Sequence, residues 1–222
     1  MGKLIVFEGT DGSGKSTQFE LLAKRLEAEQ IGFQRLRFPQ YEEPSSALIR
    51  MYLGGAFGDD PEAVNAYAAS TFYAVDRYAS YQRVWKDYYQ GGGFVVSDRY
   101  TTSNAVHQGS KVPEGERAEF FRWLYDLESD RMGLPRPDLV VLLDMPVELS
   151  EQLMRKREQS TGTHADIHER DEDYLKKCRD VALHAAKYYG WRTVSCAKNG
   201  AIRGVEDIHE EVYAIVKSCL ED

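Results

Sequence analysis

The residues best suited to chemistry lie near the start of the chain, in a run with the spacing of a phosphate loop. Residues 9–16 match G-x-x-x-x-G-K-[ST], with Lys15 and Ser16 closing the pattern. In such a loop the glycines let successive backbone N–H groups converge on an anion at the positive end of a helix. Lys15 would reach the β- and γ-phosphates, and the Ser16 hydroxyl would ligate Mg²⁺. We therefore predict a nucleotide-phosphate site formed by Gly9, Thr10, Asp11, Gly12, Ser13, Gly14, Lys15, Ser16 and Thr17.

The flanks of this run supply the context that the motif requires. Residues 3–8 are mostly apolar and typical of a buried strand. After the loop, Leu22, Arg25 and Leu26 recur at helical spacing among good helix formers. Strand, glycine loop and helix are thus predicted in the order that phosphate loops need.

Acidic residues end two later apolar runs. Asp98 ends residues 94–98, and Asp144 ends residues 138–144. A carboxylate at the carboxyl end of a strand in a phosphate-loop fold can hold Mg²⁺ or its waters, so the two acids compete for this role. We favour Asp98 because Arg99 follows it, and an arginine can grip a phosphate through its bidentate fork.

Five apolar runs alternate with longer helical patterns, at residues 3–8, 33–38, 94–98, 138–144 and 191–195. This alternation indicates βαβ units and a mainly parallel sheet with helices on both faces. Ligands of such sheets bind beyond the carboxyl ends of the strands. We expect residues 1–222 to form one α/β domain with the three-layer P-loop NTPase fold, a five-stranded mainly parallel sheet and a small lid segment.

A long helix is predicted between the second and third strands. Asp60 has the character of an N-cap and Pro61 that of a first helical residue, and glycines at 91–93 end the pattern. Tyr73 and Arg77 are four residues apart and share one face. The pair could stack on a nucleobase and hydrogen-bond to it, although taken alone such a pair is more often packing.

Two loops offer further ligand-binding groups. Phe38 and Tyr41 place aromatic side chains in the proline-containing loop after the second strand. The alternative interpretation of this loop is a plain connection between a strand and a helix. Short polar groups that could read a base edge or a sugar hydroxyl follow Arg99. They are Thr101, Thr102, Ser103, Asn104, His107 and Gln108.

Residues 155–170 form a charged segment with almost no apolar anchor. One interpretation is a solvated loop between two helices. The other is a mobile lid, whose arginines Arg155, Arg157 and Arg170 close on transferring phosphates and exclude water.

Composition restricts the class of partner and compartment. The 222 residues carry a formal net charge of -8, which argues against nucleic acid or an anionic membrane surface as partner. No apolar run approaches 18 residues and the chain starts directly with a strand, so we expect neither a signal peptide nor a membrane span. Three widely spaced cysteines favour reduced thiols in a cytoplasmic protein.

A phosphate loop alone does not say what is done with the phosphate. An ATPase or switch module needs a water-positioning residue, and the guanine-reading N-K-x-D run of GTPases is absent from the sequence. A kinase for a small acceptor needs a second basic site and a lid, which Arg77, Arg99 and the lid arginines would supply. The kinase is favoured, with an ATPase regulatory module as the alternative.

The chain resembles the thymidylate kinases, bacterial-type nucleoside-monophosphate kinases that phosphorylate dTMP. The motifs that carry this resemblance are Phe7-Glu8-Gly9-x-Asp11-Gly12-x-Gly14-Lys15-Ser16-Thr17, Phe38-Pro39, Phe72-Tyr73-Ala74-x-Asp76-Arg77, Asp98-Arg99-Tyr100-x-x-Ser103-Asn104 and Pro137-Asp138-Leu139. The alternative within enzymes is a kinase for another nucleoside monophosphate or a deoxynucleoside.

The resemblance implies a role for each matching residue. Asp11 would contact the acceptor's 3′-hydroxyl or its phosphate network, and Tyr73 would stack on thymine. Arg77 would bond the thymine carbonyl and Asn104 the ring edge. Arg99 would grip the dTMP phosphate, and Asp98 would serve Mg²⁺ and the transfer step. ATP as donor and a homodimer are also implied.

The chain departs from the family pattern at three positions. His107 stands where an aromatic ring that disfavours ribose is common, and Gln40-Tyr41 stands where relatives often place an arginine for the acceptor phosphate. Gly12 replaces an arginine that some relatives carry after the loop aspartate. We therefore expect the catalytic positive charge to come from the lid, with Arg157 as the first candidate.

Overall fold

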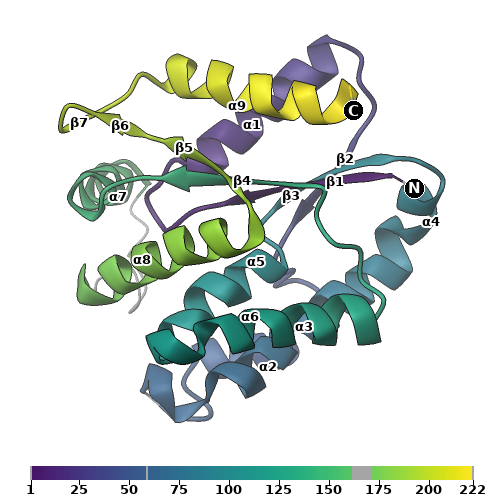
Figure 1. Cartoon of the computed structure of the whole chain (residues 1–222), viewed down its shortest axis with the longest axis vertical. Helices are drawn as coiled ribbons and strands as arrows, with labels where there is room; N and C mark the ends of the chain where they lie inside the picture. Colours follow the sequence, from purple (N-terminus) through teal and green to yellow (C-terminus); the bar gives the residue numbers. More distant parts are fainter. Residues whose placement is uncertain (1, 59, 162–171, 222) are drawn as a thin grey trace. The chain divides into compact units, whose positions relative to one another are not determined.

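The structure, a computed structural model, describes residues 2–58, 60–161 and 172–221, and of residues 61, 156–161 and 172 only the backbone. Five strands form one sheet in the order β2-β3-β1-β4-β5 (Figure 1). They are β1 (Lys3–Glu8), β2 (Gln34–Arg37), β3 (Phe94–Asp98), β4 (Leu139–Asp144) and β5 (Arg192–Ser195). The predicted α/β fold, with a parallel sheet flanked by helices, is confirmed.

The chain divides into two compact units. The first unit comprises residues 1–6 and 33–138, and the second comprises residues 7–32 and 139–222. The prediction that residues 1–222 form one domain with a lid at 155–170 stays a prediction.

The first unit pairs β2 with β3 in parallel, in a register that sets Arg37 opposite Asp98. Its α-helices are α2 (Ala47–Leu53), α3 (Ala66–Ser80), α4 (Lys86–Gln90), α5 (Thr101–Ser103) and α6 (Arg117–Tyr125). Three π-helical segments continue these helices, at Tyr81–Trp85, Asn104–Gln108 and Asp126–Arg131. Short 3₁₀ turns occupy Pro44–Ser46, Pro61–Ala63, Gly109–Lys111 and Glu114–Glu116.

The predicted start of the long helix is wrong. Asp60 does accept a hydrogen bond from the Glu62 amide at 2.8 Å, but it caps only the 3₁₀ turn. Val64 is extended, with φ −111° and ψ 116°, so the turn cannot continue into the helix. The helix begins at Ala66, where Asn65 is the N-cap, and helical structure then runs to Gln90, close to the predicted end.

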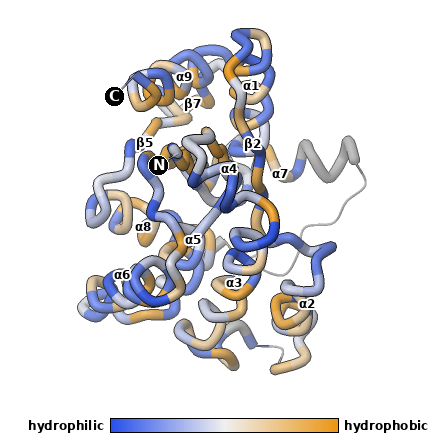
Figure 2. The backbone as a smooth tube through the Cα atoms, turned by 90° about the vertical axis from the view of Figure 1, so that its right-hand side faces the viewer, coloured by the Kyte–Doolittle hydropathy of each residue, from blue (hydrophilic) through white to orange (hydrophobic). Residues whose placement is uncertain are grey.

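The second unit contains the phosphate loop and the pair β4–β5, which is also parallel. Its helices are α1 (Lys15–Ala28), α7 (Val147–Thr161), α8 (Glu172–Tyr189) and α9 (Val205–Glu221). Within this unit, α1 and α9 lie side by side on one side of β4 and β5, and α8 lies on the other (Figure 1). Hydrophobic and hydrophilic residues alternate along α1 and α9, as expected for helices with one buried face (Figure 2).

A short hairpin that the sequence did not reveal as strands follows β5. It pairs β6 (Ala197–Lys198) with β7 (Ala201–Ile202), and its turn has Asn199 and Gly200 at positive φ. None of the helices in the described ranges has the length and apolar character needed to cross a membrane.

Candidate active site

The phosphate loop connects the end of β1 to the start of α1, as the motif predicts. Gly9, Gly12 and Gly14 all have positive φ, at 157°, 75° and 83°. Gly14 is the N-cap of α1, and Lys15 is its first residue. Backbone N–H groups at the positive end of the helix therefore lie in the loop that also carries Lys15, an arrangement suited to an anion.

Two of the loop glycines are required by close neighbours as well as by φ. A Cβ on Gly9 would lie 2.6 Å from Ser13 Oγ and 3.0 Å from the Leu143 carbonyl oxygen. A Cβ on Gly12 would lie 2.6 Å from the Ser150 carbonyl oxygen of α7. A side chain at position 9 would therefore overlap Ser13 and crowd β4, and one at position 12 would overlap the backbone of α7.

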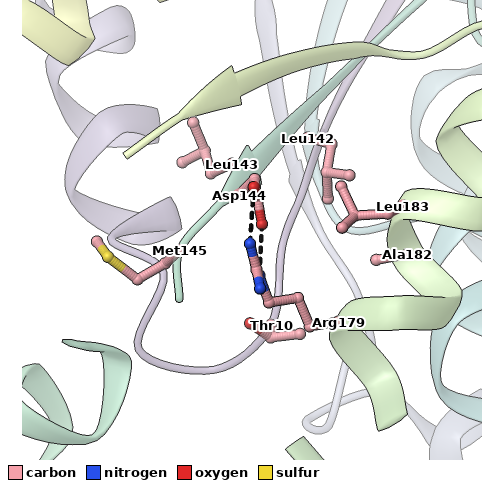
Figure 3. Close-up of a pocket in the computed structure, with 8 residues that line it drawn as sticks. All are labelled: Thr10, Leu142, Leu143, Asp144, Met145, Arg179, Ala182 and Leu183. Carbon is pink, nitrogen blue, oxygen red and sulfur yellow. Dashed lines mark hydrogen bonds and ion pairs between the residues drawn. The ribbon is translucent and has the colours of Figure 1, made fainter. Parts of the chain in front are cut away.

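Asp144, the alternative metal candidate, is held by an arginine that sequence reasoning missed. Arg179 of α8 donates from Nε to Asp144 Oδ1 at 2.7 Å and from Nη2 to Oδ2 at 3.1 Å (Figure 3). This bond with Asp144 raises the pKa of Arg179 above its usual value. Thr10 of the phosphate loop lines the same small pocket (Figure 3). The ion pair therefore joins the end of β4 to α8.

Ser16 is the residue of the loop that we predicted as a magnesium ligand. Ser16 is exposed in the first turn of α1, and no atom lies within 4 Å of the Cβ position of Gly14. The described part of the chain contains no group of three or more His, Cys, Asp or Glu residues that could hold a metal. Mg²⁺ is commonly held in proteins by one or two side chains together with phosphates and water. The Ser16 hydroxyl and the loop fit that mode of binding.

In the first unit, Asp98 and Arg99 are adjacent at the end of β3 but have different hydrogen-bond partners. Asp98 is buried and accepts a hydrogen bond from Arg37 Nε at 3.1 Å. Arg99 has φ 68°, in the left-handed region that non-glycine residues rarely adopt. Its Nη1 lies 2.9 Å from His107 Nε2 and 3.4 Å from Ser103 Oγ. Because a guanidinium has no acceptor, His107 Nε2 is the acceptor.

Arg77, predicted to bond a base, is almost completely buried and lies in a salt bridge. Its Nε and Nη2 each donate to the Glu128 carboxylate at 2.6 Å, and its Nη1 donates to the Tyr100 carbonyl at 3.3 Å. Asn104 donates from Nδ2 to the same carboxylate. The structure therefore brings Arg77 and Asn104, two of the residues predicted to contact a base, onto one carboxylate.

Tyr73 lies one turn before Arg77 on α3, as its spacing predicts. It packs against the apolar cluster of Tyr52, Val64 and Ala69. Burial raises the pKa of Tyr73 well above its usual value, so the ring stays a neutral phenol. A neutral, half-buried ring is suited to stacking on a flat ligand.

The remaining predicted residues differ in exposure. Phe38 is buried against Tyr100, with ring centroids 5.9 Å apart, whereas Tyr41 is exposed. Gln108 is buried. Of the three arginines predicted to form a lid, Arg155 is exposed and its Nη2 lies 3.5 Å from Glu151 Oε2. The side chains of Arg157 and Arg170 lie outside the described residues.

The family follows from comparison with known proteins. A family model described as thymidylate kinase matches residues 7–212. The chain belongs to the thymidylate kinase family. It is 33% identical to a thymidylate kinase of Mycobacterium tuberculosis over 190 residues, which are 85% of this chain and 87% of the relative. It is 32% identical to a probable thymidylate kinase of Thermococcus gammatolerans over 221 residues, 98% of this chain and 97% of the relative.

A solved structure of thymidylate kinase from Candida albicans has the same fold. It aligns with a TM-score of 0.72 and 23% sequence identity, covering 98% of this chain and 92% of the other. The resemblance inferred from the loop and the Asp98-Arg99-Tyr100 run is therefore confirmed at the level of the family.

The sequence analysis did not identify three residues that bind predicted site residues or the loop beside them. Glu128 binds Arg77, Arg179 binds Asp144, and Asp76 accepts hydrogen bonds from the Gln40 amide and the Ser45 hydroxyl. Asp76 belongs to the family motif at residues 72–77, but its partners in the loop are more than 30 residues away in the sequence. Glu128 and Arg179 lie in charged helical patterns that predict a solvent-exposed face, so the sequence carried no signal for them.

Proposed function

We propose that this chain transfers the γ-phosphate of ATP to dTMP, giving ADP and dTDP. The observation that carries the proposal is the thymidylate kinase match over residues 7–212. That match includes both the phosphate loop and the residues around Arg77 and Arg99.

On the donor side, the loop backbone and Lys15 would bind the ATP phosphates. Lys15 is buried, so its charge acts in surroundings with less water than the surface and interacts more strongly with phosphate. The Ser16 hydroxyl, together with Asp98, would hold Mg²⁺. The ion would neutralise charge on the phosphates during transfer.

On the acceptor side, Tyr73 would stack on thymine while Arg77 and Asn104 contact its polar edge. Arg99 would bind the dTMP phosphate, its guanidinium directed by His107 and Ser103. Asp11, Phe38, Tyr41 and Gln108 complete the proposed acceptor set. Catalysis would consist of positioning and charge neutralisation, with direct in-line transfer and no covalent intermediate.

The lid would supply further positive charge. An arginine in place of Gly12 would overlap the Ser150 carbonyl, so the loop of this chain cannot carry that charge itself. We assign the role to Arg155, Arg157 and Arg170, with Arg157 first.

We also propose that the enzyme is a cytoplasmic homodimer. Its three cysteines are thiols, which is usual in a reducing compartment. The dimer rests on the family alone, and light scattering on the purified chain at several concentrations tests it.

A coupled ADP-release assay tests the reaction. ATP and Mg²⁺ are supplied with dTMP, dUMP, dCMP, AMP or thymidine. ADP release that depends on dTMP supports the proposal. ADP release without any acceptor would indicate an ATPase instead, and release with thymidine alone would indicate a nucleoside kinase.

A further inference from the structure

The Glu128 carboxylate is completely buried, in the π-helical segment Asp126–Arg131. Its two oxygens accept hydrogen bonds from three side chains of the first unit. Arg77 supplies two of these bonds at 2.6 Å, Thr101 Oγ1 donates to Oε2 at 2.7 Å, and Asn104 Nδ2 donates to Oε1 at 3.4 Å. A buried charge needs such partners, and here two of them are the proposed readers of the base.

The carboxylate restricts the direction of the Arg77 guanidinium. A guanidinium has five N–H donors in one plane, and the bidentate bond uses one on Nε and one on Nη2. Nη1 also donates to the Tyr100 carbonyl, so the plane is held at three points. The two donors that remain, one on Nη1 and one on Nη2, point away from Glu128.

The same carboxylate sets the orientation of the Asn104 amide. The two Nδ2 hydrogens are directed to Glu128 Oε1 and to the Ser70 carbonyl, the latter at 3.1 Å. In an amide, the positions of nitrogen and oxygen are assigned by such bonds. Oδ1 is therefore the group that Asn104 offers to a ligand, and it is an acceptor.

A donor and an acceptor side by side match one class of pyrimidine. Thymine and uracil present an oxygen acceptor at position 4 and an N–H donor at position 3. Cytosine presents an amino donor at position 4 and an acceptor nitrogen at position 3. A donating Arg77 and an accepting Asn104 complement the first pattern and leave both groups unpaired against the second.

We propose that Glu128 is a positioning residue that sets the preference for 4-oxo over 4-amino pyrimidine monophosphates. It acts by fixing the direction of the Arg77 donors and, together with the Ser70 carbonyl, the acceptor end of Asn104, without contact with the substrate. The inference rests on the proposed function, because it requires that these two residues read the base.

The test is Glu128→Gln, which keeps the shape of the side chain and removes the charge. A glutamine amide presents a donor as well as an acceptor, so it no longer accepts two bonds from the Arg77 guanidinium, and the Asn104 amide is held by the Ser70 carbonyl alone. We expect the KM for dTMP to rise about tenfold, as for one or two lost hydrogen bonds. We expect the kcat/KM preference for dTMP over dCMP to fall by at least a similar factor of about ten. The KM for ATP should stay unchanged.

Asp130→Asn is the matched control. It lies in the same π-helical segment and removes an exposed ion pair with Arg136. It should leave both the KM for dTMP and the preference over dCMP as in the unmodified chain. An unchanged preference in folded Glu128→Gln would overturn the proposal. Equal losses for dTMP and dCMP would also overturn it, because they indicate general loosening.

Thr101→Val decides the matter if Glu128→Gln does not fold. It removes one hydrogen bond to Glu128 Oε2 and keeps the Arg77 pair. A smaller rise in the KM for dTMP, with a reduced preference over dCMP, supports the proposal, and no change in either overturns it. Failure of the proposed function can be told apart from failure of this inference, because the unmodified chain would then not phosphorylate dTMP at all.

Discussion

The phosphate loop and the Arg77–Glu128 network hold their functional groups in different ways. In the loop, glycines at positive φ and a helix start place backbone N–H groups, and every part lies within residues 9–17. In the network, a buried carboxylate binds side chains from α3, α5 and the Asn104–Gln108 segment. In the proposed function, backbone geometry would serve the phosphates, which are alike in all nucleotides, and side-chain partners would serve the base, which differs between nucleotides.

The two regions also differ in the solvent exposure of their ion pairs. The Arg77 and Glu128 side chains are 2% and 0% exposed, whereas Arg179 and Asp144 beside the loop are 30% and 17% exposed. Removing one partner from a fully buried pair leaves a buried charge without compensation. In a partly exposed pair, water can partly solvate the charge that remains. The Arg77–Glu128 network should therefore be the part more sensitive to substitution.

The largest effect is expected for Arg77→Ala. It leaves Glu128 buried and unpaired, so the free energy of unfolding should fall by about 3–5 kcal/mol, measured in urea. The KM for dTMP should rise while kcat changes little, because base contacts bind ground and transition states alike.

Arg83→Ala is its control. This residue lies further along the same helical run and pairs with Glu43 at the surface. Its loss should change the free energy of unfolding by roughly 0–1 kcal/mol. Similar losses in the two variants would contradict the contrast in burial, and a large fall in kcat with unchanged KM would show that Arg77 does not bind the base.

Lys15→Ala tests the phosphate side of the comparison. Loss of this charge partner should lower kcat by at least about a hundredfold, with little change in the KM for dTMP. Steady-state ADP release measures both constants. Lys24→Ala, an exposed lysine on the same helix, should retain normal turnover. Near-normal turnover in Lys15→Ala would rule out the phosphate-loop assignment.

Gly12→Ala and Gly14→Ala separate strain from steric overlap in the loop. Both positions have positive φ, which costs an alanine about 1–2 kcal/mol. Only Gly12 has a neighbour that a Cβ would strike, the Ser150 carbonyl at 2.6 Å. Gly12→Ala should therefore lose about 1–3 kcal/mol more stability than Gly14→Ala in nucleotide-free urea unfolding. Equal losses would mean that α7 does not pack closely on the loop.

The smallest effect concerns His209 on α9, in the second unit. Burial, followed by the nearby Arg25, lowers its pKa below the usual 6.5, although Glu210 and Glu206 oppose the shift. Below pH 6.5 the unfolded chain therefore binds a proton that the folded chain does not, and stability falls with the pH until the folded pKa is passed. Melting temperatures from pH 7.5 to 5 should fall less in His209→Gln than in the unmodified chain. Parallel curves would contradict this role for His209.

The sequence by itself determined the features that depend on neighbouring residues. Gly9, Gly14, Lys15 and Ser16 specify the loop because a turn at positive φ and a helix start are local events. The five strands were located within two residues, since alternation of apolar runs and helices reports burial directly. The start of α3 was misplaced because Asp60 and Pro61 cap a 3₁₀ turn as well as an α-helix.

Only the tertiary structure decided which charged side chains meet. Arg77 and Glu128 are 51 residues apart, and Asp144 and Arg179 are 35 apart. In the sequence, Glu128 and Arg179 lie in charged helical patterns that predict a solvent-exposed face. Long-range partners are chosen by how helices pack, and no local preference encodes that choice. The conformation of the phosphate loop was therefore predictable to the residue. The roles of Arg77 and Asn104 at a base stay predictions, and the Glu128 carboxylate that binds both was not predictable from the sequence.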